Sequence, residues 1–204
     1  MSRTALIAAA ALVIAGAGAG AWFALSGGDR FAQCREGGAV VGASIGGPFT
    51  LTRGDGARVS DADVIDRPTL VYFGYTHCPD FCPTDAANMA AIADLLAAQG
   101  IAINTVFITI DPARDTAEAL GRFTAQMHPD MVGLSGLAED IAAAAKAYRV
   151  YYAKAGDDPE FYLMDHSTFT YLMAPGVGFL DFFRHGEQPE AVAGRVGCYA
   201  RALG

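Results

Sequence analysis

The chain has 204 residues, of which 52% are hydrophobic, and its formal net charge at pH 7 is −8. This length suits one ordinary domain with a short appendage. Phosphate contacts need Lys and Arg, so an acidic chain without a basic patch or a glycine-rich phosphate loop is not expected to bind nucleic acid.

The first predicted element is a membrane helix. Residues 5–25 contain no charged residue, and about 20 apolar residues span a bilayer as a helix. A cleaved signal peptide is the alternative, although its apolar region is usually shorter, about 7–15 residues. Arg3 favours an orientation that keeps the short tail inside and exports the rest. We therefore expect a single-pass inner-membrane anchor over 1–26, a flexible tether over 27–47, and a domain over 48–204 in the periplasm or intermembrane space.

The domain begins with a predicted hairpin and two buried strands. The hairpin strands, Phe49–Thr52 and Ala57–Ser60, flank a turn that contains glycine. Thr69–Tyr75 and Ile101–Ile110 are near-continuous apolar runs of β-forming residues, which is typical of buried strands. Between them Pro83 suits the first turn of a helix.

The second half of the domain alternates helices and short strands. Asp115 and Glu118 match a capping box, which predicts a helix to about Met127. The remaining predictions are a strand at 131–135, a helix at 138–148, strands at 150–154, 162–164, 168–174 and 179–184, and a closing helix at 189–203. A βαβ unit followed by ββα indicates an α/β domain of the thioredoxin-like kind, with an N-terminal hairpin and a helical insertion.

Two cysteines lie four residues apart where the first buried strand gives way to a helix. Side chains four apart on a helix share one face, so Cys78 and Cys82 could bind one ion or form a disulfide. The start of a helix favours the thiolate and lowers a thiol pKa. The thiolate is both the nucleophile and the metal ligand, so the pair indicates a metal site or thiol–disulfide chemistry. A plain structural disulfide and two inert buried cysteines are the alternatives.

Four sequence blocks, found in this order along the chain, carry a family resemblance. They are Ile45–Phe49, Tyr72–Asp85 (YFGYTHCPDFCPTD), Ile110–Thr116 (IDPARDT) and Tyr162–Met173 with its Asp-His-Ser segment. Together they resemble the Sco/SenC family of copper-binding cytochrome c oxidase assembly proteins. Any one block could arise by chance, whereas four in order over most of the chain make the resemblance specific.

The resemblance implies that Cys78, Cys82 and His166 bind one copper ion per chain, as Cu(I) or Cu(II). Cu(I) prefers thiolate ligands, and imidazole suits both oxidation states. The implied function is copper delivery to the binuclear copper centre of cytochrome c oxidase subunit II by a monomeric soluble domain. Asp165 is expected either to orient His166 or to cap a turn. Asp111, at the end of the second buried strand, is expected to influence metal loading or partner contact.

The same cysteine pair leaves a second function open. Cys78 and Cys82 could be the redox pair of a membrane-tethered thiol–disulfide oxidoreductase or of a redox sensor. Common reductants use Cys-x-x-Cys and carry a proline before the facing strand, where this chain has His166. These differences favour a copper carrier, although one protein could have both activities.

The two remaining cysteines are predicted to form a structural disulfide. Cys34 lies in the tether and Cys198 in the closing helix. In an oxidising compartment such a pair could pin the tether to the domain.

Overall fold

The structure is a computed structural model that describes residues 30–35, 44–156, 158 and 161–204. The predicted membrane anchor and most of the tether lie outside these residues. Within the described residues, no helix is both long enough and apolar enough to cross a membrane. The chain divides into two units, Met1–Arg35 and Glu36–Gly204. The described part of the first unit holds one short 3-10 helix, η1 (Ala32–Cys34).

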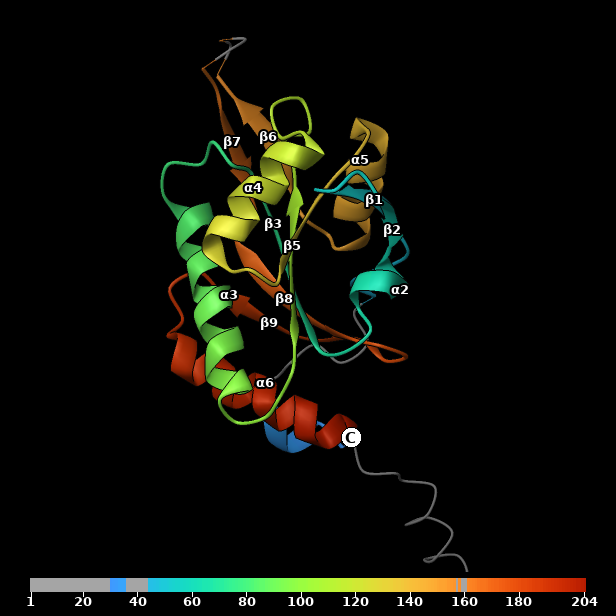
Figure 1. Cartoon of the computed structure of the whole chain (residues 1–204), viewed down its shortest axis with the longest axis vertical. Helices are drawn as coiled ribbons and strands as arrows, with labels where there is room; N and C mark the ends of the chain where they lie inside the picture. Colours follow the sequence, from blue (N-terminus) through green and yellow to red (C-terminus); the bar gives the residue numbers. More distant parts are fainter. Residues whose placement is uncertain (1–29, 36–43, 157, 159–160) are drawn as a thin grey trace, which may run out of the picture. The chain divides into compact units, whose positions relative to one another are not determined.

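The second unit is built on a mixed sheet of seven strands in the order β2-β1-β5-β4-β3-β8-β9 (Figure 1). The strands are β1 (Thr50–Arg53), β2 (Arg58–Ser60), β3 (Thr69–Gly74), β4 (Asn104–Thr109), β5 (Met131–Ser135), β8 (Phe169–Ala174) and β9 (Gly178–Arg184). Strand β3 lies inside the sheet, parallel to β4 and antiparallel to β8. All six of its residues are buried, as its continuous apolar run predicts.

Helices cover both faces of this sheet. They are α2 (Asp61–Val64), α3 (Phe81–Ala97), α4 (Ala117–Met127), α5 (Ala138–Ala147) and α6 (Pro189–Leu203). Successive side chains of a strand point to opposite faces. Accordingly Tyr72 packs on Phe107, which contacts Phe123 of α4, while the next residue, Phe73, packs on Tyr148 at the end of α5. Helix α3 contacts both α4 and α6.

The predicted α/β thioredoxin-like arrangement, with its hairpin and its order of elements, is confirmed. The structure adds the short helix α2 and an antiparallel pairing of β1 with β5. It also separates β6 (Tyr152–Ala155) and β7 (Leu163–His166) from the main sheet as a two-stranded ribbon. The predicted strand at 162–164 corresponds to β7, which begins at Leu163 and extends to His166.

The predicted cap of α4 was wrong. The N-cap is Thr116, whose hydroxyl accepts a hydrogen bond of 3.2 Å from the Ala119 amide. Asp115 is fully buried, and its carboxylate accepts hydrogen bonds from the Thr76 amide (2.9 Å) and the Thr109 hydroxyl (2.8 Å). Because its oxygens accept hydrogen bonds from residues at the ends of β3 and β4, Asp115 fixes the start of the cysteine loop, the turn between β3 and α3. It does not cap α4.

A close approach of two glycines provides a test of this packing. A methyl group on Gly121 of α4 would stand 2.9 Å from the Cα atom of Gly54 after β1. Gly121→Ala should therefore lower the free energy of unfolding, because overpacking typically costs about 1–3 kcal/mol. The preference of a helix for Ala over Gly returns only about 0.8–1.0 kcal/mol. Chemical denaturation of the purified protein measures the difference.

The matched control is Gly194→Ala in α6, where an added methyl group meets nothing within 4 Å. This substitution should raise stability through helix propensity alone. Equal effects of the two substitutions would contradict the packing described for α4 and β1.

Candidate metal centre

The cysteine loop occupies the turn between β3 and α3. Cys78 lies in this turn, and its amide donates to the Tyr75 carbonyl at 3.3 Å. Cys82 is the second residue of α3, and its amide donates to the Cys78 sulfur at 3.4 Å. The first amides of a helix have no partner within the helix. One of them is therefore satisfied by a cysteine sulfur, which brings the two thiols together.

Gly74 makes room for the second of these thiols. A Cβ atom at Gly74 would stand 2.9 Å from the Cys82 sulfur and 2.7 Å from the rings of Tyr72 and Phe107. Any larger residue at the end of β3 would displace the sulfur or the aromatic core beneath it. The glycine of the Tyr-Phe-Gly-Tyr segment thus has a packing role in the site.

The expectation that the helix start lowers the thiol pKa was wrong for Cys82. Its side chain is fully buried, and this burial raises the pKa of the thiol well above its usual value. A thiolate loses its hydration in such a place, and this cost outweighs the favourable helix terminus. Cys82 therefore stays protonated near neutral pH until a metal ion or another partner compensates for the charge.

His166 approaches Cys82 from the other side of the site. It is the last residue of β7, and its Nε2 lies 3.4 Å from the Cys82 sulfur. Its Nδ1 lies 2.9 Å from the Ser167 carbonyl, which can only accept a hydrogen bond. We therefore assign the proton of the neutral ring to Nδ1, which leaves the Nε2 lone pair facing the sulfur.

Burial also keeps the His166 ring neutral. It lowers the imidazole pKa below its ordinary value, so the metal-binding form predominates at pH 7. The rings of Tyr72 and Tyr75 stand edge-on to the imidazole, with centroids 6.1 and 5.9 Å away. These contacts restrict the plane in which the imidazole can lie.

The ligand atoms of Cys78, Cys82 and His166 all lie within 4.8 Å of one another, and both cysteines are free thiols. Bonds from a metal ion to sulfur or nitrogen are about 2.0–2.3 Å long, so a single ion can reach all three atoms. Two soft sulfur ligands and one imidazole suit copper or zinc better than the hard cations Mg²⁺ or Ca²⁺.

The two carboxylates expected to assist the site have different positions. Asp165 is exposed on β7, and the Nδ1 bond of His166 goes to the Ser167 carbonyl. A role for Asp165 in orienting the ring stays a prediction. Asp111 is buried, forms an ion pair with Arg114 at 2.6 Å and accepts a hydrogen bond from the Tyr162 hydroxyl at 2.8 Å.

The predicted disulfide joins residues of two different units. Cys34 lies in η1 of the first unit, and Cys198 lies in α6 of the second unit. Their pairing stays a prediction.

A buried acid near the site, Asp85, was not predicted from the sequence. Asp85 of α3 is buried, its Oδ1 lies 2.8 Å from His185 Nδ1, and burial raises the pKa of its carboxyl group. The His185 ring also packs edge-on against Phe81, with centroids 4.7 Å apart. The only signal in the sequence was an acidic residue one helical turn after Cys82. Its partner lies 100 residues away.

Comparisons with known proteins agree with the site. A family model described as SCO1/SenC matches residues 39–201. Protein SenC of Rhodobacter capsulatus is 50% identical over 204 residues, which cover 99% of this chain and 92% of SenC. The mitochondrial SCO1 homolog 1 of Arabidopsis thaliana is 41% identical over 73% of this chain, but the match covers 45% of that protein.

A solved structure shares the fold. The crystal structure of Arabidopsis thaliana ScoI with copper bound is 38% identical and has a TM-score of 0.72, with 77% of this chain and 99% of that chain covered. The family match extends over most of this chain and includes all three ligand candidates. The chain therefore belongs to the SCO1/SenC family.

Proposed function

We propose that this protein is a copper metallochaperone that binds one copper ion through Cys78, Cys82 and His166. The observation that carries the proposal is the convergence of these three ligand atoms within 4.8 Å. The copper-bound state of the Arabidopsis relative, which shares this fold, supports the same conclusion. Three protein ligands leave a position at which a recipient's ligand can enter, and a carrier needs such a position to transfer its cargo.

The recipient follows from the family resemblance. We infer that copper is passed to the binuclear copper centre of cytochrome c oxidase subunit II. The predicted anchor over residues 1–26 would hold the domain at the inner membrane, on the periplasmic or intermembrane-space side. The soft ligands fit the transfer of Cu(I), since thiolates bind it strongly and can be exchanged one at a time.

A second candidate function uses the same cysteines as a redox pair. The contact between the Cys82 amide and the Cys78 sulfur places the two thiols close together. A thiol–disulfide oxidoreductase or a redox sensor needs such proximity. Cys78 is the slightly exposed member, at 9%, whereas Cys82 is at 0%. Cys78 is therefore the thiol that an external disulfide could reach.

Copper loading tests the proposed function. The reduced protein, mixed with Cu(I) or Cu(II) without oxygen, should retain one copper ion per chain. His166→Ala should weaken copper affinity at least 100-fold, because even the removal of groups behind a metal ligand typically costs about 10–100-fold. Cys78→Ser and Cys82→Ser should abolish retention. Copper per chain after dialysis against a competing chelator is the measurement.

His77→Ala is the matched control, because this histidine precedes Cys78 directly but its side chain is 52% exposed. It should bind copper as the natural protein does. If His166→Ala retained as much copper as the natural protein, or if His77→Ala lost as much copper as His166→Ala, the redox function would be the better explanation of the cysteine pair.

Thiol labelling tests the asymmetry between the two cysteines. In the reduced, metal-free protein at pH 7, iodoacetamide should modify Cys78 at least 10-fold faster than Cys82. The thiolate is the reactive species, and burial disfavours it at Cys82. Mass spectrometry of the labelled peptides from Cys78→Ser and Cys82→Ser gives the two rates separately. Faster labelling of Cys82 would contradict the burial described here.

A further inference from the structure

The third ligand candidate belongs to a part of the structure that is separate from the main sheet. β6 and β7 pair with each other, and Tyr152 lies opposite His166 in their register. The two cysteines, by contrast, follow β3, an interior strand of the main sheet. The distance between His166 and Cys82 therefore depends on how the β6–β7 ribbon is held against the rest of the domain.

The alternation along β7 shows which face is held. Met164 and His166 are two residues apart on β7, so they lie on one face of the strand. Tyr162, just before the strand, continues the alternation, and all three are partly buried. Leu163 and Asp165 point the other way and are exposed. The face that carries the ligand candidate is thus the face that meets the domain.

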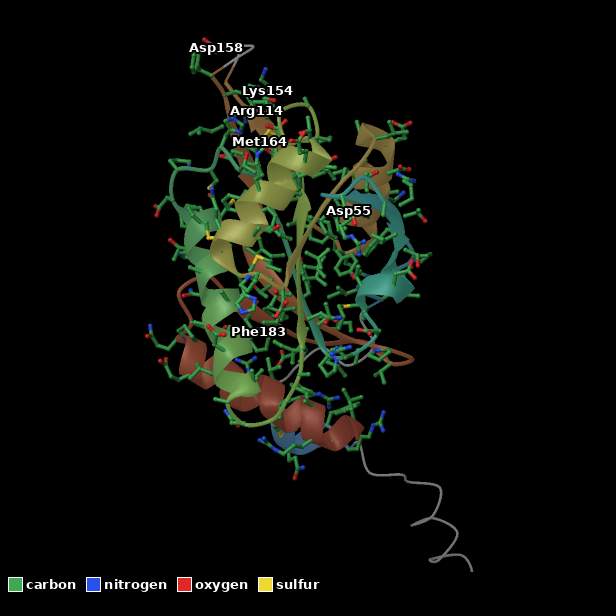
Figure 2. The ribbon with its side chains drawn as sticks, in the orientation of Figure 1. Asp55, Arg114, Lys154, Asp158, Met164 and Phe183 are labelled. Carbon is green, nitrogen blue, oxygen red and sulfur yellow. The ribbon has the colours of Figure 1, made fainter. Side chains whose placement is uncertain are left out.

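Two hydrogen bonds to the domain come from the backbone of this segment. The Met164 amide donates to the Tyr75 hydroxyl at 3.2 Å. The Tyr162 carbonyl accepts from Arg114 Nη1 at 3.0 Å. Arg114 follows β4, and in Figure 2 it lies near Met164 and Lys154 at the ribbon end of the domain.

The Tyr162 side chain completes a cluster with a buried ion pair. Its hydroxyl donates to Asp111 Oδ1 at 2.8 Å, while Arg114 Nε donates to Asp111 Oδ2 at 2.6 Å. The Tyr162 ring lies 3.5 Å from the Arg114 guanidinium carbon and 4.0 Å from Lys154 Nζ. The Asp111 and Arg114 side chains are only 4% and 17% exposed.

Because this cluster is buried, it favours one position of the β6–β7 ribbon. A buried ion pair becomes more stable with each remaining donor or acceptor that finds a partner. Tyr162 supplies two of these partners, its hydroxyl to Asp111 and its carbonyl to Arg114. If the ribbon moved away, both charged groups would lose a hydrogen bond in a poorly hydrated place. The ion pair therefore favours the docked position of the ribbon.

We propose that Asp111, Arg114 and Tyr162 form a clasp that docks the β6–β7 ribbon and so positions His166 beside the two cysteines. The three are positioning residues, since they act on the metal ion only through His166. The proposal rests on the proposed copper function for its consequence, but the docking itself can be measured without metal. It gives the Asp-Pro-x-Arg loop, through Asp111 and Arg114, a role in keeping His166 within reach of the metal ion.

The metal-free, full-length chain provides the first test. Tyr162→Phe removes the hydroxyl and keeps the ring, and Tyr151→Phe is the matched control because Tyr151 is 64% exposed near the base of the ribbon. Tyr162→Phe should accelerate amide hydrogen exchange in β7 about ten-fold, the order expected for one lost hydrogen bond to a charged group. It should also shift the His166 ring signals in NMR, because the ring leaves Tyr72 and Tyr75.

Arg114→Lys is a second variant that keeps the charge. A lysine cannot donate to Asp111 and to the Tyr162 carbonyl in the fixed geometry of a guanidinium. It should therefore behave as Tyr162→Phe does, with secondary structure unchanged by circular dichroism. Exchange rates and ring signals that match those of Tyr151→Phe in both variants would overturn the clasp.

Copper binding then tests the action through His166. Tyr162→Phe should weaken copper affinity about ten-fold in the natural chain, and it should have no further effect when combined with His166→Ala. Equal weakening in both backgrounds would mean that Tyr162 does not act through His166 and would overturn the proposal. If His166→Ala bound copper as tightly as the natural chain does, the proposed function would fail. The hydrogen exchange and the ring signals of the metal-free protein would still decide whether the clasp exists.

Discussion

The structure of the site depends on one buried carboxylate, that of Asp115. It is fully shielded from solvent and accepts hydrogen bonds from Thr76 after β3 and Thr109 at the end of β4. Its own carbonyl accepts from the Ser135 hydroxyl at the end of β5 at 2.6 Å. A buried charge without these donors would be strongly unfavourable. Asp115 therefore fixes the ends of three strands together, and with them the first residues of the cysteine loop.

The site that follows is assembled from groups that burial keeps neutral. Burial raises the pKa of the Cys82 thiol and lowers that of the His166 imidazole. Both shifts disfavour charged side chains, because burial removes the water that would stabilise them. A soft metal cation would supply the missing positive charge and stabilise the thiolates. The same surroundings that make Cys82 a poor free nucleophile thus suit it to hold a metal ion.

The two halves of the ligand set are held by different means. Cys78 and Cys82 are held by local geometry, through a strand, a tight turn and the first amides of α3. His166 is held by tertiary contacts with two tyrosine rings and by the docking of a separate ribbon. This division lets one side of the site stay rigid while the other depends on a small number of polar contacts.

Most of the fold and the identity of the ligand candidates could be predicted from local patterns of residues. Apolar runs predicted β3 and β4, and Pro83 indicated the first turn of α3. The motifs around Cys78, Cys82 and His166 pointed to copper. All of these are local patterns in the chain. The folded structure was needed for every feature that depends on residues distant in sequence. It showed that Asp115 serves the strand ends and that Thr116 caps α4. It brought Asp85 close to His185. It also showed that burial raises the pKa of the Cys82 thiol, which the start of the helix was expected to lower. Burial and long-range hydrogen bonds set these properties, and neither can be read from a local pattern.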